Sequence, residues 1–420
     1  MSLEECDLSA ERAGMNHDHT AEVLTAARLS PPRLDRLTRA RVATSAFFLV
    51  DGMTFGTWAA LIPSFQQRFV LSAGQLSWVL VGIVAGAMAS MPIAGRLTTS
   101  YGSHRVGFAA GVAFPGCLLA LMLAPNAMCL VAAATLFGAC KGLMDIAVNA
   151  QGIAVENALG RPVISSFNGF WSLGGLAAAA TLSFALHRGA GAPLLLGVMS
   201  AALMATTLVS GRHLLPEQSA PTVPRNPSRT LPDGRLLALG ALAFLALFSE
   251  GVLLDWSAVY AHTVARVSLA TAPVAFAAFS VCMAAGRFAG DVFTARWGTA
   301  AALRLGAALM VVGTGVATLG QTWSATLVGF MVVGFGVANL VPIIFRAAGR
   351  VHAHGAGPGV AVVSTLGYTG FLCGPPTVGF LAAAAGLPGA FCLVIVFGLI
   401  LAAVGGSVLS AASRGPSSAF

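Results

Sequence analysis

The segment Ser166-Phe167-Asn168-Gly169-Phe170 returns 198 positions later as Ser364-Thr365-Leu366-Gly367-Tyr368, and both copies lie in apolar stretches. Four further pairs occur in the same order at separations of 196 to 199 residues: Asp51-Gly52 with Glu250-Gly251, Trp58 with Trp256, Gly102 with Gly298, and Phe137-Gly138 with Phe335-Gly336. Together the pairs predict that a unit of about 200 residues is duplicated. Two six-helix units in the same orientation are typical of transporters.

The composition excludes a soluble globular protein. Hydrophobic residues make up 57% of the chain and charged residues only 9%, whereas soluble domains carry about 25% charged residues. We therefore predict an all-α membrane protein. The net charge of +8 is scattered over short loops, without a basic stripe or an aromatic platform, so we expect no nucleic-acid partner.

Twelve apolar stretches are long enough to cross a bilayer, which takes about 20 residues. They cover residues 43–65, 75–95, 106–124, 127–149, 164–186, 193–211, 236–259, 271–290, 301–320, 324–346, 358–384 and 387–410. This pattern predicts two six-helix bundles, at 42–211 and 236–410. A proline-rich cytoplasmic linker at 212–235 joins them, and we expect disordered cytoplasmic tails at 1–41 and 411–420.

The arginines predict the orientation. If the N-terminus is cytoplasmic, nineteen arginines lie on the cytoplasmic side and only Arg68, Arg188 and Arg266 on the other. This asymmetry places both termini in the cytoplasm. Residues 1–40 are polar and show no signal peptide, so we expect the first apolar span to stay in the protein.

The sequence offers no sign of a metal, a cofactor or an enzyme. The seven cysteines show no metal-ligand spacing and fit the role of small buried hydrophobic residues. No Gly-x4-Gly-Lys loop is present, which excludes direct use of ATP by this chain.

Ionisable residues inside the spans are the strongest functional signal, because a charge at the bilayer centre costs about 2.5–3.5 kcal/mol. They lie in the first, fourth, seventh and tenth spans: Asp51, then Lys141 and Asp145, then Glu250 and Asp255, and finally Arg346, whose span also contains Asn339. One such span occurs in every group of three. We therefore predict that these four spans carry the functional site.

Lys141 is the only lysine in the chain. It shares a helix face with Asp145, four residues on, and Asn149 extends that face by a turn. The pair could simply hold helices together. We favour a role in binding substrate or protons, because apolar packing could replace a purely structural pair at little cost.

The two repeat-related acids receive different roles in this interpretation. Asp51 lies at about the same depth as Lys141, so we predict that the two pair. Glu250 has no basic residue within a helical turn, and burial without a partner favours the protonated carboxyl. We therefore predict that Glu250 carries the coupled proton, with Asp255 as the second candidate.

Asn168, Trp171, Trp256 and Tyr368 are candidates for substrate contact, together with Lys141, Asp145, Asn149 and Asn339. For any one of Asn168, Trp171, Trp256 and Tyr368, ordinary packing is the stronger explanation.

Residues 42–410 resemble the major facilitator superfamily in their twelve spans, six-plus-six repeat and central linker. The resemblance implies that the first, fourth, seventh and tenth helices line a central cavity. The superfamily's loop signature is degenerate here. Gly95 and Gly102 are present, but Thr99 and Ser100 replace its acid and base, so we expect no latch built on that acid.

Several motifs are similar to a bacterial branch typified by a membrane protein encoded with rhizopine-synthesis genes: Asn149-Ala150-Gln151, Ser172-Leu173-Gly174-Gly175, Asp255-Trp256-Ser257 and Arg346-Ala347-Ala348-Gly349-Arg350. That resemblance implies a sugar- or cyclitol-like solute and a multi-pass protein of the bacterial cytoplasmic (inner) membrane.

These patterns favour a proton-coupled secondary transporter that works by alternating access, with a small solute, protons and the lipid bilayer as its partners. We expect a monomer. Efflux of an amphipathic compound is the alternative, although the fifth span lacks the Gly-Pro pair that drug/proton antiporters carry there. A membrane sensor or enzyme would need a catalytic constellation that the chain does not show. Substrate identity, direction of transport and coupling ion stay open.

Overall fold

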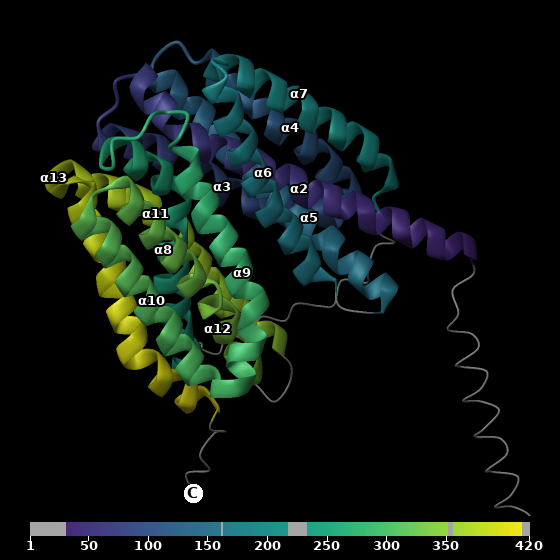
Figure 1. The fold of residues 1–420 in the computed structure, drawn as a ribbon. Helices are drawn as coiled ribbons and strands as arrows, with labels where there is room; N and C mark the ends of the chain where they lie inside the picture. The colour runs from purple at the N-terminus through teal and green to yellow at the C-terminus, as the bar shows by residue number, and fades with distance from the viewer. Residues whose placement is uncertain (1–30, 161–162, 217–232, 352–355, 414–420) are drawn as a thin grey trace, which may run out of the picture.

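A computed structural model describes residues 31–160, 163–216, 233–351 and 356–413, and Figure 1 shows its two halves side by side. The described residues are helical, without strands. The first half contains α2 (Pro31–Arg68), α3 (Ala73–Tyr101), α4 (Ser103–Leu123), α5 (Ala127–Leu159), α6 (Ile164–His187), α7 (Ala192–Ser210) and the short η1 (Gly211–His213). The second contains α8 (Gly234–Thr263), α9 (Pro273–Trp297), α10 (Thr299–Gly320), α11 (Trp323–Val337), α12 (Leu340–Arg350) and α13 (Ala356–Ser413).

The twelve predicted spans are confirmed. The described residues contain eleven apolar segments long enough to cross a membrane, of which the last is 51 residues long. That segment makes two passes, because α13 is interrupted at Gly386, where φ is 71°. The tenth span combines α11 with α12 across a break at residues 338–339.

Helix ends differ from the predicted boundaries in one place that matters. The sequence pattern predicts a tail up to residue 41, but α2 begins at Pro31, so residues 31–41 are helical. These residues continue the first span because no glycine lies among them. Their two prolines, Pro31 and Pro32, occupy the first turn of the helix, where proline is tolerated. Residues 1–30 and 414–420 of the predicted tails, and residues 217–232 of the predicted linker, lie outside the described residues.

The repeat is visible in the backbone. Gly102 precedes α4 with φ of 83°, and its counterpart Gly298 precedes α10 with φ of 82°. A positive φ of this kind is readily adopted only by glycine. The two halves therefore turn from their second to their third helix in the same way.

Glycine seams bring backbones into contact within the first half. A Cβ at Gly52 of α2 would lie 1.9 Å from the carbonyl oxygen of Trp171 on α6, and one at Gly138 of α5 would lie 2.0 Å from that of Ile83 on α3. Helices in lipid associate through such close packing. These two seams hold α2 against α6 and α5 against α3, and α2, α5 and α6 carry the charged residues described below.

We expect Gly52→Ala to lower the thermal stability of the purified protein. The added methyl group must push α6 away from α2, and overpacking of this kind costs about 1–3 kcal/mol. Gly169→Ala on α6 is the matched control, because nothing lies within 4 Å of a Cβ there. Equal melting temperatures for the two variants would contradict the seam's importance.

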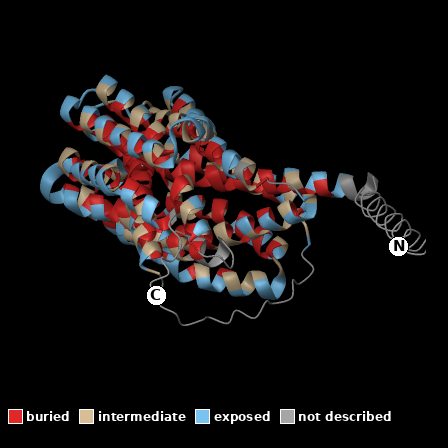
Figure 2. Cartoon of the chain, turned by 90° about the horizontal axis from the view of Figure 1, so that it is seen from below, coloured by how far each residue is buried: buried red, intermediate tan, exposed pale blue. Residues whose placement is uncertain are grey.

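Burial follows the layout of a membrane protein. Figure 2 shows buried residues gathered inside the bundle and exposed ones around it. Many of the exposed side chains are large and apolar, such as Leu319, Leu123 and Phe184. Such outward apolar side chains are suited to lipid.

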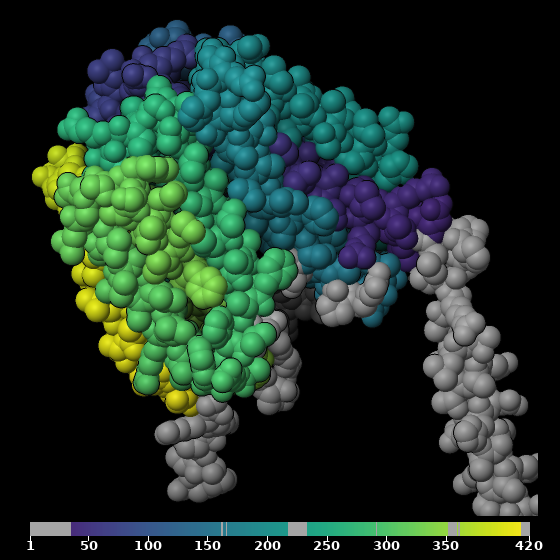
Figure 3. Space-filling view, in the orientation of Figure 1, coloured from purple at the N-terminus to yellow at the C-terminus, as the bar shows by residue number. Residues whose placement is uncertain are grey.

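The two halves meet at what we call the closed end, formed by residues 69–72, 188–191 and 264–272. There the rings of Trp78 on α3 and Phe380 on α13 lie 5.2 Å apart. Ser183 Oγ on α6 donates to the carbonyl oxygen of Ala270 over 2.7 Å. At the opposite end, which we call the open end, Figure 3 shows the surface notched between the halves.

Candidate functional site

One cluster of charge lies in the middle of the first half and is called the lysine group here. Lys141 Nζ on α5 donates to Asp51 Oδ2 on α2 over 3.2 Å and also to Asp145, one turn along its own helix. The ring of Trp171 on α6 lies 5.8 Å from the ammonium nitrogen, within cation–π range. The structure thus brings together four residues that the sequence singled out, and the predicted pairing of Asp51 with Lys141 is present.

The lysine group carries more acid than base. The side chain of Asp51 is 2% exposed and that of Asp145 is 32% exposed, yet one ammonium serves both carboxyl groups. Asp51 Oδ1 is buried and has no hydrogen-bond partner among the described residues. If both acids are ionised, the group has a net charge of −1. A buried charge of this kind favours the arrival of a proton or of a donor from a ligand.

A second ion pair lies in the other half. Arg287 Nη2 on α9 donates to Glu250 Oε1 on α8 over 3.2 Å, and its Nη1 lies 3.5 Å from Ser172 Oγ on α6 of the first half. The side chain of Arg287 is 34% exposed, so part of the guanidinium is free to donate to a ligand.

The expectation that Glu250 lacks a basic partner is therefore wrong. Glu250 has no basic residue within a turn of its own helix, and its partner comes from α9. Arg287 nevertheless fell inside the predicted span 271–290, and an arginine inside a span is expected to seek an acid. That signal could have identified it as a site residue.

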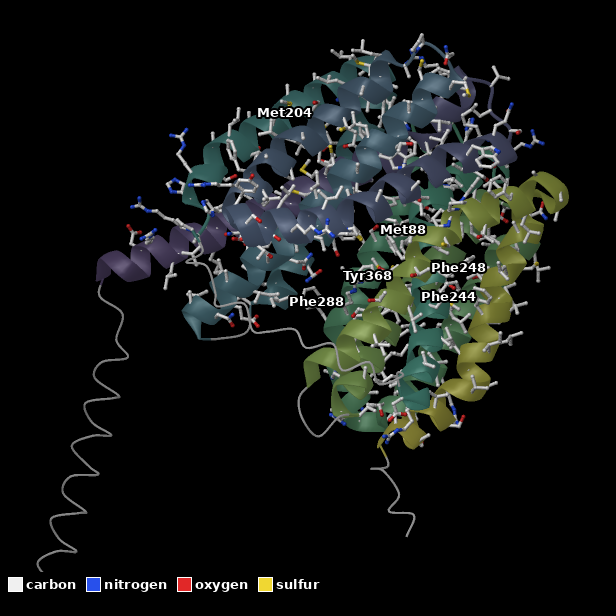
Figure 4. The ribbon with its side chains drawn as sticks, turned by 180° about the vertical axis from the view of Figure 1, so that it is seen from behind. Met88, Met204, Phe244, Phe248, Phe288 and Tyr368 are labelled. Carbon is white, nitrogen blue, oxygen red and sulfur yellow. The ribbon has the colours of Figure 1, made fainter. Side chains whose placement is uncertain are left out.

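Tyr368 connects the two charged groups. It lies on α13, is 52% exposed, and is close enough to feel the charges of both Asp145 and Lys141 in one half and of Glu250 and Arg287 in the other. Figure 4 shows it on the side of the second half that faces the first. Tyr368 is therefore an exposed side chain near two partly exposed charged groups that come from opposite halves.

The three asparagines predicted to contact a solute are each bonded to a backbone carbonyl. Asn149 and Asn168 are exposed, and the side-chain amide of each donates to the carbonyl four residues earlier. Asn339 donates to the carbonyl oxygen of Gly286 over 2.6 Å and so ties the α11–α12 break to α9.

The expected contact between Trp256 and a solute is corrected for this conformation. Trp256 is completely buried, and its Nε1 donates to the carbonyl oxygen of Pro375 on α13 over 2.9 Å. Its indole needs this acceptor, so it packs between helices and presents no surface to a ligand.

Asp255 stands apart from both groups. It is 8% exposed, and its Oδ1 has no hydrogen-bond partner among the described residues. Over the same residues, no cluster of three or more His, Cys, Asp or Glu side chains could hold a metal ion.

Comparison with known proteins relates the chain to membrane transporters. No family model matches the chain. An uncharacterized MFS-type transporter of Yersinia pestis is 35% identical over 368 residues, which cover 86% of this chain and 94% of that protein. The membrane protein MosC of Rhizobium meliloti is 32% identical over 361 residues, which cover 84% of this chain and 86% of MosC.

Solved structures show the same fold at low sequence identity. A single-residue mutant of the nucleoside transporter NupG matches with a TM-score of 0.73 and 11% identity, covering 89% of this chain and 100% of that one. A D-xylose–proton symporter matches with a TM-score of 0.67 and 15% identity, covering 87% of this chain and 97% of that one. With its twelve helices, its six-plus-six repeat and the full-length relatives, the chain belongs to the major facilitator superfamily of transporters.

Proposed function

We propose that the protein is a proton-coupled secondary transporter of a small, polar, sugar- or cyclitol-like solute, working by alternating access in a bacterial cytoplasmic membrane. The observation that carries this proposal is the pair of charged groups in opposite halves, with Tyr368 exposed between them. One chain contains both groups, so the proposal needs no second subunit.

The polar groups around Tyr368 suit a polyhydroxylated solute. Asp145 is partly exposed and offers acceptors, while the partly exposed guanidinium of Arg287 offers donors. Hydroxyl groups both donate and accept, so one such solute can satisfy both sides at once. The indole of Trp171 and the phenol ring of Tyr368 add apolar faces against which a sugar ring can pack.

Proton coupling is supported by the charge balance. The lysine group has one more carboxyl group than it has ammonium groups. A single proton would neutralise it, and a neutral site costs less than a charged one to close off from water on both sides as access alternates. The resemblance in fold to a D-xylose–proton symporter is consistent with this scheme.

The arginine distribution predicts which end of the protein faces the cytoplasm. With both termini in the cytoplasm, the closed end faces outward and the open end faces the cytoplasm, so this conformation is inward-facing. Reporter fusions within residues 217–232 and after Ser413 should both read as cytoplasmic. A periplasmic signal at either place would contradict this orientation.

A ligand screen tests the solute class. We expect a sugar or cyclitol to raise the melting temperature of the purified protein, because a ligand at 100 times its dissociation constant stabilises by about 2.7 kcal/mol. The same solute should accumulate in proteoliposomes when the pH gradient is imposed and should stop accumulating when a protonophore is added. Stabilisation only by antibiotics or other amphipathic compounds would favour efflux instead.

A further inference from the structure

Asp255 is a buried acid without a partner. It is 8% exposed and forms no ion pair or hydrogen bond within the described residues. The ionisable groups in the interior of α8 and of the helices packed against it are engaged elsewhere: Asp51 bonds Lys141, Arg287 bonds Glu250, and Tyr260 donates to the carbonyl of Ala317. Cys282 and Cys373 are free cysteines. Asp291, Arg346 and Arg350 lie toward the open end of α9 and α12.

An ionised carboxylate is expensive in such a place, whereas the protonated acid is neutral. The acid form then brings a new requirement. Its O–H is a donor and needs an acceptor, because a buried donor without one is also costly.

The neighbouring helix supplies acceptors. Proline has no N–H, so Pro375 and Pro376 leave the carbonyls of Phe371 and Leu372 without the donor four residues on. Gly251, which lies one turn before Asp255 on the same helix face, packs against the carbonyl oxygen of Phe371, 2.5 Å from its Cβ position.

The contact of Trp256 shows which residues of α13 lie beside Asp255. Its Nε1 bonds the carbonyl oxygen of Pro375. Asp255 therefore lies at the level of α13 between residues 371 and 375, beside the carbonyls that receive no N–H from Pro375 and Pro376.

Asp255 lies close to the closed end, where α3 packs against α13. Gly379 of α13 separates Trp256 from Ser77 of α3 so closely that its Cβ would lie 2.5 Å from the indole and 1.9 Å from Ser77 Oγ. Contact between α3 and α13 thus lies directly beside the residue that follows Asp255. Separation of those helices would admit water to this side of α8.

We infer that Asp255, together with the α13 carbonyls released by Pro375 and Pro376, is a proton-binding site that is filled before α3 closes against α13 and stays filled while that end is closed. The inference rests on the proposed proton coupling and names a proton-binding residue in the second half, in addition to the lysine group of the first. It replaces Glu250, which already has Arg287 as a partner.

A thermodynamic consequence makes the inference measurable without any solute. A site that holds a proton more tightly in the closed conformation must favour that conformation as the pH falls. For one linked proton, the ratio of open to closed molecules changes by about tenfold per pH unit within the transition.

The test uses the full-length protein in lipid nanodiscs, with spin labels at Arg188→Cys and Gln321→Cys in a background without native cysteines. Both positions are exposed at the closed end of opposite halves. The distance distribution is measured over a range of pH by double electron–electron resonance. We expect the short distance to increase at low pH, Asp255→Asn to be closed and insensitive to pH, and Glu250→Gln to keep the response.

A second variant keeps Asp255 in place. Replacing both Pro375 and Pro376 by alanine returns N–H donors to the carbonyls of Phe371 and Leu372. The protonated acid must then share these carbonyls with the new N–H donors, which weakens its hydrogen bond, so the midpoint should move to lower pH. An unchanged midpoint, a normal response in Asp255→Asn, or a lost response in Glu250→Gln would each overturn the inference. Because no solute is present, a failed ligand screen would count against the proposed function alone.

Discussion

Transport stops completely when cysteines placed at Gly74 and Ala383 form a disulfide, and a reductant restores it: this is the largest effect that we expect. A Cβ at Gly74 would lie 3.2 Å from the Cβ of Ala383, close to the separation of about 3.8 Å that a disulfide requires. The bond would join α3 to α13 at the closed end. Alternating access needs that end to open once in every cycle, so a permanent link removes one of its two states.

The measurement is solute uptake in proteoliposomes before and after oxidation, and again after reduction. The single variants Gly74→Cys and Ala383→Cys are the controls, because each carries the same local change without the cross-link. Ligand binding from the open end should survive in the oxidised double variant. Full transport by a protein shown to be cross-linked would contradict alternating access at this interface.

The second large effect concerns Lys141. Lys141→Ala leaves Asp51, with a side chain that is 2% exposed, without its cation. Breaking a buried pair by removing one partner costs about 3–5 kcal/mol, so we expect poor expression and a low melting temperature. Addition of Asp51→Asn removes the stranded charge and should restore most of the stability.

Transport separates a functional lysine from a structural one. We expect the double variant Lys141→Ala with Asp51→Asn to fold and yet to transport at less than about one-tenth of the normal rate, the loss of a contact worth at least about 1.4 kcal/mol. Uptake and melting temperature are measured on the same preparation. Recovery of both together would mean that the lysine group only holds α2 against α5.

The fold could be predicted because its determinants are local or repetitive. Apolar length defines each span, and Gly102 with Gly298 recurs with the same backbone conformation. The neighbourhood of Asp51 and Lys141 was also accessible, because equal depth in two helices is a property of the sequence. Pairing across the bundle was not accessible for Glu250 and Arg287, since nothing in the sequence says which faces of α8 and α9 meet.

Side-chain exposure was the other quantity that could not be predicted. Trp256 and Tyr368 are both aromatic residues inside spans, yet one is completely buried and the other half exposed. The difference comes from Gly379 and Pro375, which give the indole room and an acceptor. Such contacts join residues more than a hundred positions apart, and hydropathy does not record them.

The glycine seams have a mechanical consequence. Where Gly52 touches Trp171 and Gly138 touches Ile83, backbone rests on backbone without flexible side chains between them. Such a contact has almost no compressibility, so a small displacement produced by a ligand at Trp171 is passed on with little loss. The first half should therefore move as a rigid body. A displacement at Trp171 should reach the few contacts that hold α3 to α13 and α6 to the loop at Ala270.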